Sequence, residues 1–305
     1  MCMRKNVALV LSSGGARGIA QIGAINELKK NGFEITSVSG SSIGSLIGGI
    51  YAMGRLDDFS VWVSTLNRLD VFNIMDFTLS SHGILKVEKL FKIMEKDFPD
   101  MMIEDLNIPY VAMATDVANN KEVKFTSGSV YKAIRASIAL PALIKSVQNS
   151  DQVLVDGGVL NPIPIRQIQR TPDDIVVVVN LYDFDQEPEA DAIILHNSDE
   201  VISHPTVSIE NNTDKSKLLN RGQKLLSTVQ KKASVSNNYA SILSKVTTMM
   251  LQVNAFSAIE LHKPDIVINI PRSSAGTFDF HKSEELIKIG QLATQKAIQE
   301  FRNKH

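Results

Sequence analysis

The sequence predicts an α/β fold with a mainly parallel central sheet, on two observations. Short apolar runs, mostly rich in Val or Ile, alternate with segments of helical periodicity along the chain. A single helical segment separates the first two runs, which is the pattern of a βαβ unit with parallel strands. The four strand-like runs are residues 7–11, 35–38, 110–115 and 175–180.

The first strand-like run, residues 7–11, follows Arg4 and Lys5 and so resembles a short signal peptide. The run is too brief for that and ends in Ser-Ser-Gly-Gly, so a buried strand is the better interpretation. No stretch approaches the ~18 consecutive apolar residues that span a bilayer. We therefore expect a soluble, cytoplasmic protein with at most a peripheral contact with a membrane surface.

The segment after the first strand predicts an amphipathic helix. Apolar side chains recur at helical spacing from Ile19 to Leu28, and Gly32 then gives a helix-ending signal. After the second strand, residues 43–53 are apolar on nearly every side, which indicates a helix buried in the centre of the domain.

The later part of the chain changes in composition. Residues 183–213 are acidic, polar and rich in turn-formers, which indicates a surface insertion or a lid. Residues 218–250 regain helical periodicity with an apolar stripe, which favours core packing over membrane docking or substrate gating. We expect one domain over residues 1–305, with an insertion or lid region at about 183–250.

Composition excludes several classes of function. With 44% hydrophobic and 21% charged residues, the chain of 305 residues is typical of a globular protein. A net charge of -1 and the lack of a dense Lys/Arg run argue against a nucleic-acid partner. Cys2 is the only cysteine, which excludes an intramolecular disulfide and a cysteine-based metal site and fits a reducing compartment.

The strongest candidate for a nucleophile is Ser42, in the pentapeptide Gly40-Ser41-Ser42-Ile43-Gly44. It lies between a strand end and the apolar helix, and a serine on such a sharp turn is pushed out beyond the sheet edge. Gly40 and Gly44 lack a Cβ and so permit the tight turn and close helix packing. Small residues crowd many strand-to-helix turns, so this motif alone leaves a purely structural turn equally open.

A second candidate site follows the first strand, in residues 12–18, where Gly14 and Gly15 precede the first helix. N–H groups at a helix N-terminus lack intrahelical acceptors, and the helix dipole adds to their attraction for an anion. A tight structural turn and a dinucleotide or phosphate loop are the alternatives. Ser13 occupies the first glycine position of a G-x-G-x-x-G match and no Gly-Lys-Ser/Thr follows, so an oxyanion hole is favoured over a nucleotide site.

A third candidate is Asp156, which ends an apolar run and precedes Gly157 and Gly158. Its carboxylate would serve as general base for Ser42 if the two groups lie within about 2.6 to 3.2 Å. The alternative is a turn-forming Asp before Gly, which the dipeptide alone favours. Position in the sheet decides between them.

Histidine is the competing base, because a triad in the order Ser, Asp, His is formally satisfied by Ser42, Asp156 and one of His204, His262 and His281. No histidine has a supporting motif, and most lie in polar or loop-like contexts. The serine also follows the second strand, whereas in the conventional triad hydrolase fold it follows several. The histidines are His82, His196, His204, His262, His281 and His305.

Together these motifs resemble the patatin-like phospholipase family, in its bacterial members, over most of the chain. Residues 13–18 match the glycine-rich oxyanion loop, residues 40–44 the serine elbow, and residues 156–158 the Asp-Gly-Gly/Ala motif, in the family's order and spacing. The last helix is similar too. Other similar segments are residues 108–110, 114–116, 133–141, 161–164 and 264–266.

The resemblance implies a three-layer α/β/α fold and a serine hydrolase of the phospholipase, lysophospholipase or esterase type. Its partner would be a lipid or acyl-ester substrate, with no metal and no organic cofactor. Ser42 would attack the ester carbonyl, and Asp156 would accept the serine proton and later activate water. Gly40, Gly44, Gly157 and Gly158 support the motifs. The implied oxyanion hole consists of backbone N–H groups around Gly14, Gly15, Arg17 and Gly18.

The sequence departs from the family pattern at two places. Ser13 replaces the first of three glycines, which would shift the loop or add a hydroxyl beside the hole. Residues 142–144 stand where members more often carry Gly followed by apolar and aromatic residues, so the width of the acyl pocket is open. Lipid class, acyl-chain length, cleavage position, oligomeric state and pathway stay open as well. The rival hypotheses are a Ser-His-Asp esterase or acyltransferase, and a non-catalytic α/β regulatory or binding protein.

Overall fold

The chain divides into two compact units, one of residues 1–186 with 251–305 and the other of residues 187–250. All strands that the structure describes belong to the first unit. The computed structural model describes residues 5–74, 87–141, 143–148, 151–183 and 239–304.

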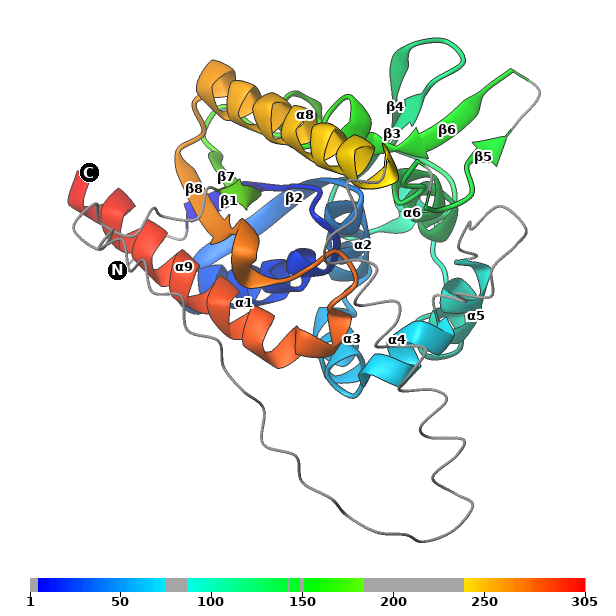
Figure 1. The fold of residues 1–305 in the computed structure, drawn as a ribbon. Helices are drawn as coiled ribbons and strands as arrows, with labels where there is room; N and C mark the ends of the chain where they lie inside the picture. The colour runs from blue at the N-terminus through cyan, green and yellow to red at the C-terminus, as the bar shows by residue number, and fades with distance from the viewer. Residues whose placement is uncertain (1–4, 75–86, 142, 149–150, 184–238, 305) are drawn as a thin grey trace, which may run out of the picture. The chain divides into compact units, whose positions relative to one another are not determined.

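A mainly parallel sheet forms the centre of the first unit (Figure 1), and it has eight strands within the described residues. The strand order is β5-β6-β3-β2-β1-β7-β8, and β4 pairs with β3 beside this path. Pairs within β3-β2-β1-β7-β8 are parallel, whereas β4 and β6 pair with β3, and β5 with β6, in antiparallel fashion. The strands are β1 (Lys5–Leu11), β2 (Phe33–Ser41), β3 (Tyr110–Asp116), β4 (Lys121–Phe125), β5 (Val147–Gln148), β6 (Val153–Asp156), β7 (Ile175–Asp183) and β8 (Ile266–Pro271).

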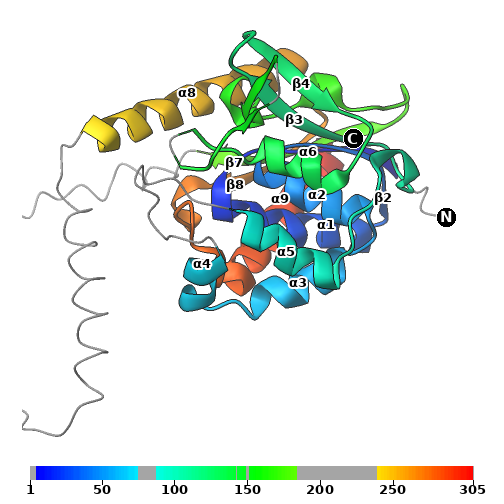
Figure 2. The same ribbon diagram turned by 90° about the vertical axis from the view of Figure 1, so that its right-hand side faces the viewer.

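Helices cover both faces of this sheet, as Figure 2 shows from the side. The α-helices are α1 (Ala20–Lys30), α2 (Ile43–Ala52), α3 (Leu56–Ser64), α4 (Arg68–Ile74), α5 (Glu88–Asp97), α6 (Val130–Ser137), α8 (Tyr239–His262) and α9 (Ser283–Lys304). Short 3-10 turns are η1 (Gly15–Ile19), η2 (Ile103–Asp105), η3 (Gly157–Val159), η4 (Ile165–Gln167), η6 (Arg272–Ser274) and η7 (Phe280–Lys282).

Side chains that alternate along β1 point to opposite faces of the sheet and so show which helices cover each face. Leu9 and Leu11 point into the larger apolar core, which α1, α2 and α9 complete. Ala8 and Val10 point into a second core on the opposite face, which is closed by η4 and by residues 251–262 of α8. All four side chains are fully buried, as expected for a parallel strand with helices on both faces. The three-layer α/β/α fold is thereby confirmed.

The four expected strands are found with longer bounds, and the helix expected at 43–53 ends one residue earlier, at Ala52. Residues 7–11, 35–38, 110–115 and 175–180 lie in β1, β2, β3 and β7, and the helices expected after the first two strands are α1 and α2. Gly32, with a φ of 84°, follows the end of α1 as its sequence signal indicated.

The expected insertion or lid at 183–250 lies almost entirely outside the described residues and stays a prediction, as does the single-domain organisation. Only residues 239–250 of the expected helical stretch are described, and they form the first half of α8. No helix in the described parts of the chain combines the length and apolarity that crossing a bilayer requires.

Candidate active site

Ser42 lies on the turn between the last residue of β2 and the first residue of α2. Its φ of 55° and ψ of -123° are unusual for a residue with a Cβ and mark local strain. A Cβ at Gly44 would lie 2.2 Å from the carbonyl oxygen of Leu11, and one at Gly40 would lie 2.3 Å from that of Gly44. Both glycines are therefore required, because backbone from β1 and from α2 occupies the space that a side chain would fill.

The sheet register places Ser42 and Asp156 on either side of β3. Ser41 pairs with Met113, and Asp156 pairs with Ala114, the next residue of β3. Because β2 and β6 both pair with β3, the pairing brings the side chains of Ser42 and Asp156 to the same end of β3. The Ser42 hydroxyl donates a hydrogen bond of 2.5 Å to Asp156 Oδ2.

The Asp156 carboxylate is almost completely buried, whereas Ser42 is half-buried. Oδ1 of Asp156 accepts a hydrogen bond of 2.8 Å from the N–H of Gly158, so both carboxylate oxygens have a donor. Burial raises the pKa of Asp156 to about 6, and the two hydrogen bonds from Ser42 and Gly158 oppose that rise. A base with a pKa near 6 is ionised at neutral pH and can still take up a proton.

The loop after β1 presents free backbone donors next to this pair. The structure records no acceptor for the N–H groups of Gly14 and Gly15 among the residues that it describes. The N–H groups of Ser13 and Ala16 on either side are used, by Pro162 and Thr277 respectively. Gly15 has a φ of 62°, and its Cβ would lie 2.9 Å from the Thr277 oxygen, so only glycine fits there.

Close packing joins this loop to the serine elbow. A Cβ at Gly18 would lie 2.3 Å from the side chain of Ile43, the residue after Ser42. The Arg17 side chain is buried, and its Nη1 donates to the Ala275 carbonyl oxygen at 3.2 Å. The Arg17 side chain thus links this loop to Ala275, and the role of the Arg17 backbone in the oxyanion hole stays a prediction.

Two contacts of the site were missed at the sequence level. The Ser137 hydroxyl accepts a hydrogen bond of 2.9 Å from the N–H of Ser42 and so holds the elbow from α6. Tyr182, at the end of β7, forms a buried hydrogen bond of 2.5 Å with the Ser13 hydroxyl. Ser137 lies in residues 133–141, which resemble a family segment, whereas nothing in the sequence singled out Tyr182.

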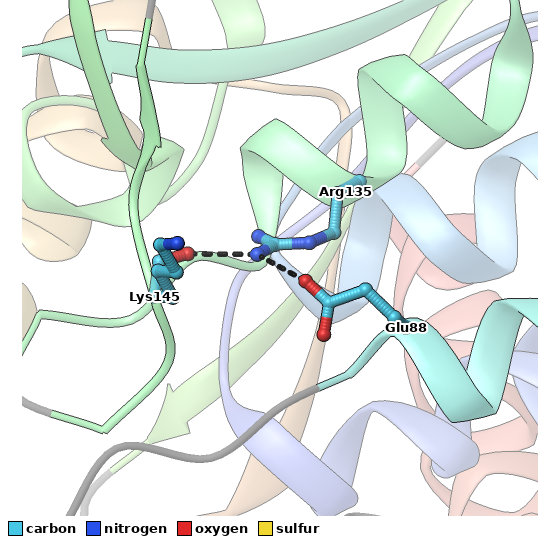
Figure 3. A network of polar contacts seen from close by, with 3 residues as sticks. All are labelled: Glu88, Arg135 and Lys145. Atoms are coloured by element: carbon cyan, nitrogen blue, oxygen red, sulfur yellow. Dashed lines mark hydrogen bonds and ion pairs between the residues drawn. The ribbon is translucent and has the colours of Figure 1, made fainter. Parts of the chain in front are cut away.

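The helix that carries Ser137 is itself anchored by a partly buried arginine (Figure 3). Arg135 Nη2 donates to the carbonyl oxygen of Lys145 at 2.9 Å and to Glu88 Oε1 at 3.3 Å. These contacts tie α6 to the start of α5 and to the loop before β5. The position of the Ser137 hydroxyl therefore depends on two segments outside α6, the start of α5 and the loop before β5.

The described histidines lie away from the Ser42 hydroxyl bond. His281 accepts a hydrogen bond from Arg68 Nε at 3.0 Å, and His262 is in the last turn of α8. The third candidate, His204, lies outside the described residues, as do His82, His196 and His305. Among the described residues, the group that accepts the hydrogen bond from the Ser42 hydroxyl is the Asp156 carboxylate.

Comparison with known proteins supplies the family. Residues 9–168 match the family model of the patatin-like phospholipases, a segment that contains all three motifs. An uncharacterised NTE family protein of Mycobacterium tuberculosis (strain ATCC 25618 / H37Rv) is 29% identical over 97% of this chain and 92% of its own length.

Two further comparisons involve a fungal protein and a solved structure. Lysophospholipase NTE1 of Yarrowia lipolytica is 33% identical over 59% of this chain but only 13% of its own length. VipD from Legionella pneumophila has a TM-score of 0.48 and 14% identity, covering 98% of this chain and 67% of its own. Because the family model covers more than half of the sequence, the chain belongs to the patatin-like phospholipase family, whose members are lipid hydrolases.

Proposed function

We propose that the protein hydrolyses carboxylic ester bonds of lipids with a Ser42–Asp156 dyad. The observation that carries the proposal is the hydrogen bond of 2.5 Å from the Ser42 hydroxyl to a buried carboxylate, at a strained turn. A nucleophile in direct contact with a base is the arrangement that activates a serine.

In the proposed reaction, Asp156 accepts and returns one proton in acylation and one in deacylation. Asp156 takes the Ser42 proton as Oγ attacks the ester carbonyl, and the carbonyl electron pair moves to oxygen. When the tetrahedral intermediate collapses, the alkoxide leaving group takes the proton from Asp156, and the acyl group stays on Ser42. Asp156 then accepts a proton from water as the water attacks the acyl-enzyme. Collapse returns that proton to Ser42 and releases the carboxylic acid.

The charge that develops on the carbonyl oxygen is accepted by the loop after β1. Among the described residues, the N–H groups of Gly14 and Gly15 have no recorded acceptor and would serve as donors, and the backbone of Arg17 and Gly18 would complete the oxyanion hole. Each such donor typically contributes about 3 kcal/mol to transition-state stabilisation in serine hydrolases.

An apolar cavity supports an acyl substrate. It has a volume of about 50 Å³, and every lining side chain is aliphatic or aromatic, or Met. Its wall includes Ile19, at the end of η1, and Leu46, one helical turn after Ser42. Trp62 and Phe280 form other parts of the wall. A hydrocarbon chain is the part of a lipid that such a lining would hold.

A fluorophosphonate probe tests the proposal, because it reacts only with an activated serine. We expect labelling of the wild type, mapped to Ser42 by peptide mass spectrometry, and loss of labelling in Ser42→Ala. Asp156→Asn should label at least a hundredfold more slowly. Ser37→Ala, which removes a buried hydroxyl elsewhere on β2, should label like the wild type.

Hydrolysis of p-nitrophenyl esters and of phospholipid and lysophospholipid vesicles then separates the rivals. Turnover lost in Ser42→Ala supports the hydrolase. A folded wild type that neither labels nor turns over any ester favours the binding protein. Activity that is lost on replacing one histidine favours the conventional triad, in which Asp156 orients that histidine, whereas the dyad predicts no such loss.

A further inference from the structure

The hydroxyl groups of Ser13 and Tyr182 form a buried pair next to the turn that carries Asp156. Ser13 and Tyr182 are 3% and 2% exposed, and their oxygens are 2.5 Å apart. Ser13 belongs to the loop after β1, and Tyr182 lies near the end of β7. Each hydroxyl has one proton, and only one of the two protons can lie in the bond between them. When Tyr182 donates to Ser13, the Ser13 proton turns elsewhere.

The side chain of Ser13 occupies the space next to the aspartate turn. A Cβ built on Gly158 would lie 2.7 Å from Ser13 Oγ and 3.0 Å from Asp156 Oδ1. Both oxygens therefore border the same small space above Gly158. The backbone of Ser13 reaches the same loop, since its N–H donates to the Pro162 oxygen at 2.9 Å. Ser13 thus contacts the aspartate loop by backbone and side chain.

The groups around Tyr182 keep it neutral. Burial raises the pKa of Tyr182 to about 12, and the charge of Asp156 adds to the rise, while Ser13, Arg17 and Arg272 oppose it. The α8 helix contributes a neutral contact, in which Gln252 Nε2 donates to the Tyr182 carbonyl oxygen at 3.0 Å. A phenol that stays protonated can donate a hydrogen bond at every pH at which Asp156 titrates.

We propose that Ser13 and Tyr182 are positioning residues for Asp156: Tyr182 donates to Ser13, which holds the Asp156–Gly158 turn and directs its hydroxyl dipole toward Oδ1. This dipole favours the ionised over the protonated form of the Asp156 carboxyl group. It also holds the carboxylate in the orientation in which it accepts the hydrogen bond from Ser42. The inference rests on the proposed role of Asp156 as the base. Ser13 replaces a glycine of the family pattern, so this support is specific to the chain and not to the motif.

The test compares Ser13→Ala, Ser13→Gly and Tyr182→Phe with the wild type. Each variant removes one hydroxyl, so Asp156 should protonate more readily and the acid limb of kcat/KM for p-nitrophenyl butyrate should move to higher pH. We expect a shift of about half a pH unit, which corresponds to a roughly threefold loss at pH 5.5 and less than twofold at pH 8. In the double variant that combines Ser13→Ala with Tyr182→Phe, the acid limb should shift no further than in Ser13→Ala alone. The reason is that the Tyr182 hydroxyl acts on Asp156 only through the Ser13 hydroxyl.

Two matched controls isolate the effect from general loss of packing. Ser37→Ala removes a buried serine hydroxyl on β2, and Tyr131→Phe removes a buried tyrosine hydroxyl on α6 that donates to Phe98. Neither should move the acid limb. The inference would be overturned if Ser13→Ala and Tyr182→Phe fold but leave the acid limb of kcat/KM at the same pH. This holds even if both variants lose the same fraction of kcat/KM at every pH.

A second measurement does not depend on turnover. The pKa of Asp156 can be followed by ¹³C NMR of side-chain carboxyl groups, with Asp156→Asn to assign the signal. A rise in this pKa in Tyr182→Phe supports the pair even if no ester is hydrolysed, whereas an identical titration contradicts it. A wild type without esterase activity would therefore overturn the proposed function separately from the hydroxyl pair.

Discussion

Ser42 and Asp156 each adopt a state that the folded protein has to enforce. Ser42 has a backbone conformation that residues with a Cβ avoid, and Asp156 carries its carboxylate in a site from which water is almost absent. Strain and desolvation concentrated at one contact are typical of a functional site. The strain at Ser42 and the burial of the Asp156 charge both lower the free energy of unfolding. Replacing either residue by one that relieves the cost should therefore raise that free energy.

The strain at Ser42 is tested by two variants that both remove the hydroxyl. Glycine adopts a φ of 55° without steric cost, whereas alanine keeps the Cβ. Ser42→Gly should therefore be more stable than Ser42→Ala by about 1 kcal/mol, measured by urea unfolding. Equal stabilities would mean that the turn relaxes when the serine is replaced.

The burial of Asp156 predicts how stability changes with pH. Its folded pKa of about 6 lies above the ordinary value of 3.8, so the folded state binds more protons between these values. The contribution of Asp156 to stability is present at low pH and is lost as pH rises toward 6. Asp156→Asn should thus be more stable than wild type at pH 8 by about 1 to 3 kcal/mol.

Urea unfolding at pH 8 and pH 4.5 checks this expectation. The advantage of Asp156→Asn should shrink at pH 4.5, because the wild-type carboxyl is then largely protonated. An advantage of the same size at both pH values would show that hydrogen bonding, and not ionisation, causes it.

At the scale of elements, the contact between α1 and α9 depends on two glycines. A Cβ at Gly23 would lie 1.9 Å from the Ile287 oxygen, and one at Gly290 would lie 1.9 Å from the Ala20 oxygen. The backbones of the two helices therefore approach as closely as glycine permits. This pairing matters to the site because α1 continues directly from η1.

Gly23→Ala and Gly290→Ala should each reduce the free energy of unfolding by about 2 kcal/mol or more. The added methyl forces the helices apart, which outweighs the roughly 1 kcal/mol that alanine gains over glycine in a helix. Gln295→Ala on the exposed part of α9 serves as the control and should change stability by less than about 0.5 kcal/mol. A neutral Gly290→Ala would show that α9 can slide along α1.

At the scale of the molecule, the family motif region is not a complete folding unit. The matched residues 9–168 contain the whole proposed dyad, yet β7, β8 and α9 follow them. β7 lies directly beside β1, so its removal would expose a central edge of the sheet. α9 covers the α1 side of the core with buried Leu286 and Ile298.

A protein that ends at residue 168 should accordingly fail to fold, although it retains Ser42 and Asp156. We expect it to be insoluble, or to lack near-ultraviolet circular dichroism and cooperative thermal unfolding, whereas the full chain shows both. Restoring only residues 169–271 should recover part of the secondary structure but leave the α1 side of the core uncovered. Cooperative unfolding of the shortest form would contradict this expectation.

The sequence by itself determined four of the strands, the first two helices and the local shape of the three motifs. Residues 7–11 and 175–180 read as buried strands because both of their faces are apolar, and periodicity and turn residues are local properties. The glycines beside Ser42 and the paired glycines after Asp156 indicated sharp turns for the same reason. Family, fold class and the residues most worth testing all came from these local signals.

Only the tertiary structure decided which of these residues meet. The contact between Ser42 and Asp156 depends on the antiparallel pairing of β6 with β3, which no periodicity encodes because pairing joins segments distant along the chain. The same holds for Ser137 under the elbow and for Tyr182 against Ser13. The raised pKa of Asp156 follows from burial by all of these segments together, so it is a property of the packed molecule and of no single motif.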